Sequence, residues 1–209
     1  MTKNDLTIKV RKMKQSDLDK VVSIHHQAFP DFFMTLMGSL FLKKYYLTVM
    51  EYKESIALVH LDNINNLSGF AVGFIDPKLF YKFFMQKFFR FLFPIAIGLI
   101  LKPYLLKRIL IGFFRVNNSK DQNSSKTLCE LSSIGVAKKG SGIGKILLVE
   151  FINECFIKGS EALVLATDLN NNENVIAFYK SIGFKQYKIE LQGKREMAHF
   201  KLLKPVNRD

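Results

Sequence analysis

The chain has 209 residues, and its 31 lysines and arginines against 18 acidic residues give a formal charge of +13. This length is enough to bury the core of one ordinary domain without disulfides or metals, so we expect a single domain over residues 1–209. The positive charge favours anionic partners such as nucleic acid, acidic lipid or a nucleotide-bearing cofactor, but charge alone does not choose among them.

The two cysteines and the N-terminal sequence favour a reducing compartment. Cys129 falls in a predicted strand and Cys155 in a predicted helix, without the spacing of a zinc site or a CxxC pair. We expect both to be small buried hydrophobic residues, and we expect no metal. The N-terminal stretch MTKNDLTIKVRKMKQSD is polar and has no apolar core of a signal peptide, so we expect a cytoplasmic protein.

The first part of the chain has the patterns of a strand, two helices and a hairpin. Alternation over residues 6–13 predicts a strand, and Ser16 is a candidate N-cap for a helix that ends near residues 29–31. Apolar spacing predicts a second helix over residues 36–50. The runs SIALVHL and LSGFAVGFI, separated by a polar turn at residues 62–66, predict two paired strands.

The middle of the chain, residues 77–118, is basic and aromatic and contains no Asp or Glu. Polar residues recur at every fourth position, which predicts a helix with one polar stripe: Lys78, Lys82, Gln86 and Arg90. The uncharged run 91–101 is shorter than the roughly 20 residues that span a bilayer. Two roles stay open for this inserted helical segment, namely a cover over an acceptor cleft and a peripheral contact with acidic lipid. It resembles no nucleic-acid-binding module, so we expect no nucleic acid.

The rest of the chain alternates strands and helices after the polar loop NNSKDQNSS. The patterns predict a strand at 127–136, a helix at 143–158, a strand at 161–168, a helix at 173–182, and strands near 184–190 and 195–203. This order predicts an α+β (α/β mixed) fold built on one mixed sheet.

A glycine-rich stretch, KKGSGIGK at residues 138–145, joins a predicted strand to a predicted helix. A P-loop would need glycine at Lys139 and a hydroxyl at Ile146, and a dinucleotide fingerprint would need glycine at 145 or 147. Both motifs are excluded. Two alternatives remain: a turn that holds a pyrophosphate at a helix N-terminus, and a plain turn whose glycines only satisfy backbone geometry.

A second pattern follows this loop after one helix and one strand. The segment NNNENVIAFYKSIGF has the apolar spacing of a helix, and Gly183 is well placed to end it. Together, the strand CELSSIGV, the loop and this segment resemble the GNAT superfamily of acyl-CoA-dependent N-acyltransferases over residues 127–190, with a looser match before them. The loop matches at Lys139, Gly142 and Gly144, with Lys139 in place of the family's Gln or Arg. The second motif matches at Asn172, Tyr179, Gly183 and Phe184.

This resemblance implies a central mixed, mostly antiparallel sheet flanked by helices, with the helical insertion before the fourth strand. It implies acetyl-CoA as cofactor and direct transfer of the acetyl group to a primary amine of a small molecule. The pantetheine arm is expected to contact Asn172, Tyr179 and the backbone of Ile134, Gly135 and Val136. The loop is expected to hold the pyrophosphate through Lys139, Gly140, Ser141, Gly142, Ile143, Gly144 and Lys145.

Tyr179 and Glu130 are the catalytic candidates. By the resemblance Tyr179 is the general acid, with packing as its alternative role, and Asn172 has the alternative role of a helix N-cap. Strand alternation predicts that Glu130, Ser132, Ile134 and Val136 share one face. The resemblance implies that Glu130, six residues before Val136, is the base that draws the amine proton, often through water. A carboxylate in an apolar strand costs free energy unless it is paired, which favours a functional role, whereas a strand that begins later would leave Glu130 solvated. A histidine, His25 or His26, or a water molecule is the alternative base.

The acceptor is suggested by a softer similarity. The segment HHQAFPDFFMTLMGSLFLKKYY resembles the N-terminal region of GNAT-like proteins of bacterial surface-polysaccharide biosynthesis, which implies an amino sugar on a nucleotide or lipid carrier. The expected acceptor-lining residues are His26, Phe29, Phe33, Tyr81 and Tyr104. The alternative is a non-catalytic acyl-CoA-binding or membrane-surface partner protein of the same fold. The sequence carries no signal for an oligomeric state.

Overall fold

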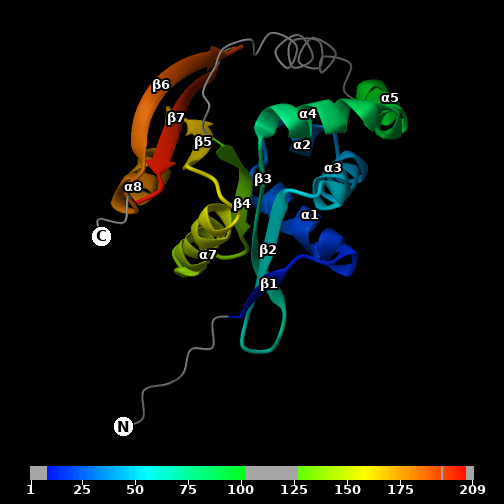
Figure 1. Cartoon of the computed structure of the whole chain (residues 1–209). Coiled ribbons are helices and arrows are strands. Elements are labelled where there is room, and N and C mark those ends of the chain that lie inside the picture. The colour runs from blue at the N-terminus through cyan, green and yellow to red at the C-terminus, as the bar shows by residue number, and fades with distance from the viewer. Residues whose placement is uncertain (1–8, 102–126, 194, 206–209) are drawn as a thin grey trace.

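The computed structural model of the chain describes residues 9–101, 127–193 and 195–205. A seven-stranded sheet in the order β1-β2-β3-β4-β5-β7-β6 forms its centre (Figure 1). Within the described residues the pair β4–β5 is parallel, and every other neighbouring pair is antiparallel. The expected mixed, mostly antiparallel sheet flanked by helices is therefore confirmed.

The chain begins with a short strand and a group of helices. These are β1 (Val10–Lys12), the 3-10 helix η1 (Gln15–Asp17), α1 (Leu18–Ala28), α2 (Phe33–Leu36) and α3 (Ser39–Glu51). The early part of the strand predicted at 6–13 lies outside the described residues. The helix α1 ends where expected, with Phe29 as its C-cap.

Two predictions for this region are wrong. Ser16 is not a helix cap, because it lies inside η1, and Asp17 occupies the N-cap position of α1. The Asp17 carboxylate accepts the backbone N–H of Lys14 and pairs with Arg11. The single helix predicted over residues 36–50 is divided, because Gly38 adopts φ +91° and starts α3 anew. Glycine tolerates this left-handed region, where an ordinary helix cannot continue.

The predicted hairpin is confirmed as β2 (Ser55–Leu61) and β3 (Leu67–Ile75). Their turn is held by Asp62, whose Oδ1 accepts the backbone N–H groups of Ile64 and Asn66. Such side-chain bonds replace the strand ladder with a local turn. The hairpin strands β2 and β3 lie between β1 and β4 in the sheet.

Three helical segments follow β3: α4 (Pro77–Gln86), η2 (Phe88–Phe91) and α5 (Leu92–Leu101). Asp76 caps α4 by accepting the N–H of Leu79. The predicted polar stripe is interrupted, because α4 ends at Gln86 and Arg90 instead lies in η2, where it pairs with Glu51. Among the described residues no single helix is long and apolar enough to cross a membrane. The helix α4 and the segment η2–α5 reach that length and apolar character only when taken together, and they are bent by 67° relative to each other. The boundaries of an insertion at 77–118 stay a prediction, since residues 102–126 lie outside the described part.

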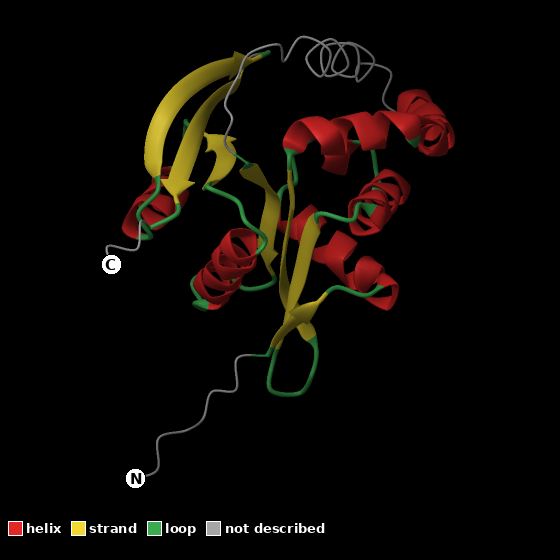
Figure 2. Cartoon of the chain, in the orientation of Figure 1, coloured by secondary structure: helices red, strands yellow, loops and turns green. Residues whose placement is uncertain are grey.

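The remaining elements lie close to their predicted positions. They are β4 (Leu128–Val136), α7 (Ile143–Ile157), β5 (Ala162–Asp168), α8 (Glu173–Ser181), β6 (Lys185–Gln192) and β7 (Arg195–Leu203). Figures 1 and 2 show α7 and α8 on one side of the sheet and α1 and α3 on the other.

Each face of the sheet therefore has its own core. The first core joins α1 and α3 to β3 around Val21, Leu42 and Phe70, and each of these is fully buried. The second core joins α7 and α8 to the other face and includes the fully buried Phe151. Cys129 and Cys155 are free and buried in this second core, in the role expected for them.

Candidate functional site

The parallel strands β4 and β5 pair over only three residue pairs and then separate. The pairing ends at Glu130 and Val164, although β4 continues to Val136 and β5 to Asp168. Over its second half, the edge of β4 that faces β5 therefore has no strand partner among the described residues. Free N–H and C=O groups on a strand edge can pair with another extended chain that carries amides. This is the kind of edge that a pantetheine arm would need.

Strand β4 also contains a bulge just beyond Glu130. Gly73 of β3 lies opposite Leu131, and Val72 lies opposite Ser133, so Ser132 has no residue directly across from it. Ser132 hydrogen-bonds the hydroxyl of Tyr45 on α3. An extra residue of this kind bends a strand and disturbs the alternation of its side chains.

The bulge corrects one prediction about β4. Ser133 also faces α3, where it lies near the hydroxyl of Tyr46. Beyond it the faces are exchanged: Ile134 and Val136 pack in the second core with α7, whereas Gly135 lies against Phe70 of the first core. The prediction that Glu130, Ser132, Ile134 and Val136 share one face is therefore wrong after Ser132.

Gly73 makes room for this bulge. A Cβ atom at this position would lie 2.0 Å from the carbonyl oxygen of Glu130 and 2.6 Å from the ring of Phe151. Neither distance is possible for a real Cβ, so β3 must carry glycine where β4 approaches it. The backbone position of Glu130 thus depends on a residue in the neighbouring strand.

Glu130 is half-buried and faces the helices α3 and α4. The hydroxyl of Tyr81, on α4, donates to its Oε1 over 2.9 Å. Burial raises the pKa of Tyr45, and the nearby charge of Glu130 raises it further. The structure thus brings the predicted base Glu130 together with one predicted acceptor residue, Tyr81. Sequence reasoning missed Tyr45, although Ser132, its partner, lies two residues from Glu130 on the same face.

The glycine-rich loop places an uncapped helix N-terminus next to the end of β4. Gly140 and Gly142 adopt φ +74° and +78°, and Gly142 is the N-cap of α7 without a side-chain cap. The hydroxyl of Ser141 donates to the carbonyl of Lys138, away from the helix. The N–H groups of Ile143 and Gly144, at the start of α7, have no acceptor among the described residues.

This loop fits a bound pyrophosphate. Free N–H groups at a helix N-terminus and the helix dipole favour an anion. Lys138, Lys139 and Lys145 are exposed around them, and a Cβ at Gly140 or Gly142 would find open space. Geometry and charge therefore both suit a phosphate-bearing ligand.

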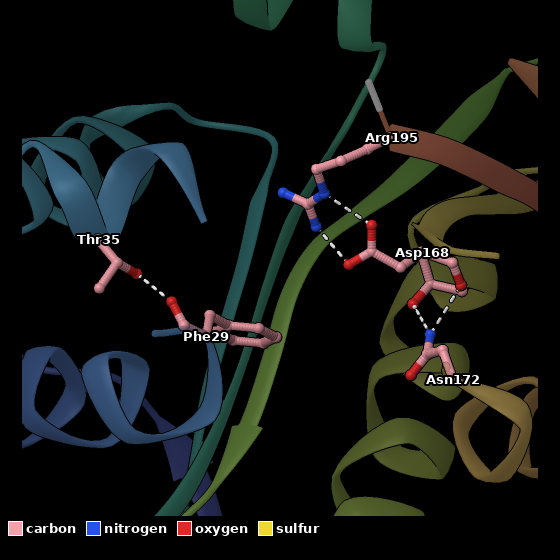
Figure 3. A network of polar contacts seen from close by, with 6 residues as sticks. Phe29, Thr35, Asp168, Asn172 and Arg195 are labelled. Atoms are coloured by element: carbon pink, nitrogen blue, oxygen red, sulfur yellow. Dashed lines mark hydrogen bonds and ion pairs between the residues drawn. The ribbon is translucent and has the colours of Figure 1, made fainter. Parts of the chain in front are cut away.

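Asn172 connects the end of β5 to the start of α8. Its Nδ2 donates to Thr167 Oγ1 and to the carbonyl of Asp168, each over 2.8 Å (Figure 3). Asn172 is the N-cap residue of α8, but its side chain makes no capping bond. Its amide oxygen accepts no bond from another described residue, which leaves an acceptor for a ligand amide.

Tyr179 lies on α8 and packs in the second core. It is 6% exposed, and its ring lies 5.7 Å from that of Phe184 and 6.1 Å from that of Phe200. Its hydroxyl has no hydrogen-bond partner among the described residues. Burial raises its pKa, so the phenol stays protonated and has a proton to donate near neutral pH.

Arg195 joins the two halves of the molecule across the separated strands. Its guanidinium pairs with both carboxylate oxygens of Asp168, at the end of β5 (Figure 3). Its Cζ lies 4.2 Å from the ring centroid of Phe32, in the segment between α1 and α2. Phe32 in turn packs against Phe29, whose carbonyl accepts the hydroxyl of Thr35. Sequence reasoning missed Arg195, because the residues it joins are distant in sequence and carry no shared local pattern.

The other predicted site residues lie in different surroundings. His26 shares a 3.0 Å hydrogen bond with Ser39, and the ring of Phe33 packs against that of Phe41. Neither contacts Glu130 in the part of the chain that the structure describes, and Tyr104 lies outside it. His25 is 1% exposed and shares a 2.5 Å hydrogen bond with Tyr46. Burial lowers the pKa of His25 to about 4, so it stays neutral inside the first core.

The separated parallel strands, the bulge and the uncapped glycine-rich helix start together suit an extended ligand that carries phosphate groups. The acetyltransferase (GNAT) family model matches residues 18–184. The chain belongs to this family. Its members use acetyl-CoA, which is therefore the expected acyl donor here, and membership implies N-acetyltransferase activity.

Solved structures share this fold. NAA60 from Arabidopsis thaliana in complex with acetyl-CoA is 16% identical, with a TM-score of 0.59 over 94% of this chain and 98% of that chain. An N-acetyltransferase from Staphylococcus aureus Mu50 is 18% identical, with a TM-score of 0.59 over 93% and 96%. Ribosomal-protein-alanine N-acetyltransferase from Brucella melitensis is 15% identical, with a TM-score of 0.58 over 93% and 98%. Comparison with curated proteins gives no match.

Proposed function

We propose that this protein transfers the acetyl group of acetyl-CoA directly to a primary amine of a small molecule. The observation that carries the proposal is the separation of β4 from β5 beside the uncapped start of α7. An amino sugar on a nucleotide or lipid carrier is the proposed acceptor, because the exposed lysines and the net positive charge would attract its phosphates. Free buried cysteines suit action in a reducing cytoplasm.

The chain offers binding groups along the whole length of the coenzyme. The backbone of Ile134–Val136 would pair with the pantetheine arm, and the side-chain oxygen of Asn172 would accept one of its amide protons. Residues 139–145 would hold the pyrophosphate. When bound, acetyl-CoA supplies an activated thioester carbonyl, and nearby backbone dipoles polarise such a group without any special side chain.

Two side chains are proposed to move protons. Glu130, oriented by Tyr81, accepts the proton that the amine loses, directly or through water. Tyr179 donates its hydroxyl proton to the departing sulfur, a role supported by a hydroxyl that has no hydrogen-bond partner among the described residues and that burial keeps protonated. His25 is a poorer base, because both its burial and its bond to Tyr46 hold it in the core.

A non-catalytic acyl-CoA-binding protein of the same fold is the alternative. It is favoured by the burial of Tyr179 against Phe200, which suits a packing residue. It is also favoured by Lys139, which stands where the family carries Gln or Arg. A peripheral membrane contact through α4, η2 and α5 is compatible with either function.

Substitution of the two proton-transfer residues tests the proposal. The release of free CoA thiol would be followed with a panel of amino sugars and other primary amines. We expect Glu130→Gln and Tyr179→Phe each to lower kcat by about 10²–10⁴-fold while the Kd for acetyl-CoA is unchanged. Glu154→Gln is the control, since Glu154 lies on α7 and has no proposed role in the reaction.

Two results would count against the proposed mechanism. Unchanged turnover in Tyr179→Phe would remove that residue from the reaction and leave it a packing role. Tight binding of acetyl-CoA by the wild-type protein, without turnover of any amine, would favour the non-catalytic alternative.

A further inference from the structure

The helices η2 and α5 expose a stripe of large apolar side chains, which we call the α5 face. Ile100 is 80% exposed and Leu101 is 73% exposed. The complete set is Phe89, Leu92, Phe93, Ile97, Ile100 and Leu101. Contiguous exposed apolar surface is uncommon in soluble monomers and marks a site of interaction.

The spacing of these residues places them on one side of the helical segment. Phe89, Phe93, Ile97 and Ile100 or Leu101 follow one another at intervals of three or four residues. The other side is anchored, because Phe91 is fully buried, and Ile95 and Leu99 pack against the first core. Figure 1 shows α5 at the outer edge of the helical layer, away from the sheet. The buried stripe thus holds the helical segment against the first core, while the exposed stripe faces solvent.

A groove continues the α5 face. It has a volume of about 290 Å³ and lies between α5 and the start of α3. Leu40, Ile97 and Leu101 line it and are themselves exposed, so it opens on the same side. Met37 and Pro94 close its inner wall with further apolar surface. Such a groove suits a hydrocarbon chain better than a polar ligand.

The charged residues of α4, η2 and α5 are all basic, and among them Arg90 pairs with Glu51 of α3. Lys78 and Lys82 are exposed on α4, and the Nζ of Lys87 lies 5.6 Å from the ring centroid of Phe83. The sequence from 77 to 120 contains no acidic residue. An exposed apolar helix face next to a helix that carries exposed lysines suits the headgroup region of an anionic bilayer. A symmetric pair of chains would instead bring these like charges together.

We propose that the α5 face docks on an anionic lipid bilayer, with a lipid tail entering the groove between α5 and α3. The same α4 that carries Lys78 and Lys82 supplies Tyr81 to Glu130. Docking would therefore hold the helix beside the candidate site at the bilayer surface. This surface is independent of the proposed reaction, because none of its exposed residues has a proposed role in proton transfer.

A fluorescent reporter can test insertion, because the chain contains no tryptophan. In the full-length protein, Phe93→Trp would provide one probe on the α5 face, and Ile157→Trp would provide a control at a position that is 79% exposed on α7. Vesicles of phosphatidylcholine with phosphatidylglycerol are expected to shift the Phe93→Trp emission to the blue and leave the Ile157→Trp emission unchanged. Vesicles of phosphatidylcholine alone are expected to have little effect.

Flotation measures the binding itself. We expect Phe93→Ser with Ile100→Ser to weaken binding to the anionic vesicles by at least about tenfold. We expect Lys82→Gln with Lys87→Gln to weaken it and to reduce its dependence on salt. The controls are Ile157→Ser with Leu191→Ser, which are equally exposed elsewhere, and Lys180→Gln with Lys185→Gln.

Three results would overturn the proposal. Binding that survives both α5-face substitutions would exclude this surface. A dimer that disappears on these substitutions, without vesicle binding by the wild-type protein, would show that the face joins two copies. A fall of more than about 4 °C in the Tm of the substituted protein without lipid would show that a segment of the chain itself covers the face.

Discussion

Glu130 illustrates how single residues take their setting from distant parts of the chain. Its carboxylate is half-buried in a strand, where an ionised group needs partners. The hydroxyl of Tyr81, on α4, is one such partner. The hydroxyl of Tyr45, which hydrogen-bonds Ser132, lies nearby. Glu130 could be selected from the sequence, because a carboxylate in an apolar strand is unusual. Its neighbour Tyr45 could not be selected, because α3 carries three aromatic residues, Phe41, Tyr45 and Tyr46, and no sequence pattern distinguishes among them.

His25 is predicted to make stability depend on pH. Its pKa of about 4 in the folded protein lies below the value of 6.5 for an unperturbed histidine. Between these values the unfolded chain binds more protons than the folded one, so stability is present above pH 6.5 and is lost as the pH falls toward 4. We expect a loss of about 2 kcal/mol between pH 7 and 4.5 from this residue, measured by urea unfolding.

The matched comparison is His25→Gln against His26→Gln. The first should remove this part of the pH dependence, because the buried ring and its unpaired Nε2 are gone. The second should retain it. Asp17, whose pKa is lowered by its bond to Arg11, loses its contribution only at lower pH. Equal pH profiles for wild type and His25→Gln would contradict the assignment.

At the scale of elements, the strands and helices could be predicted from local sequence patterns, whereas the interruptions within them could not. Alternation and helical spacing located β2, β3, β4 and α7 closely. The division of the helix predicted at 36–50 depends on Gly38 in a left-handed conformation, and a lone glycine in a sequence does not reveal its φ. The bulge in β4 depends on Gly73 in another strand, so β4 alone could not predict which residues face the site.

Gly73→Ala tests the role of this bulge. A methyl group 2.0 Å from the carbonyl oxygen of Glu130 forces β3 and β4 apart. We expect a loss of about 2–4 kcal/mol in the free energy of unfolding, measured by urea denaturation. Gly144→Ala is the control, because a Cβ there meets only Val136 at 3.8 Å and lies inside a helix. It should be neutral or stabilising by up to about 1 kcal/mol. Similar effects of the two substitutions would contradict this account of Gly73.

For the whole molecule, the ordered pair of glycine-rich loop and later helix motif was enough to predict the fold, and the family match confirms it. The separation of β4 from β5 could not be predicted from the residues, since no residue pattern marks where strand pairing stops. The bridge from Arg195 to Asp168 and Phe32 was missed, because it joins β7, β5 and the segment after α1. Contacts of this kind depend on which strands and loops the fold brings side by side, and a local sequence pattern does not show this.

Ligand-dependent stability tests the central claim, namely that the separated strands and the loop at 138–145 hold acetyl-CoA. The Tm of the full-length protein would be compared with acetyl-CoA, CoA, ATP and NADP. At about 100 times its Kd a ligand adds about 2.7 kcal/mol, so we expect acetyl-CoA and CoA to raise the Tm by about 5–10 °C. ATP and NADP should produce smaller shifts. Stabilisation by ATP or NADP without stabilisation by either coenzyme would contradict the account.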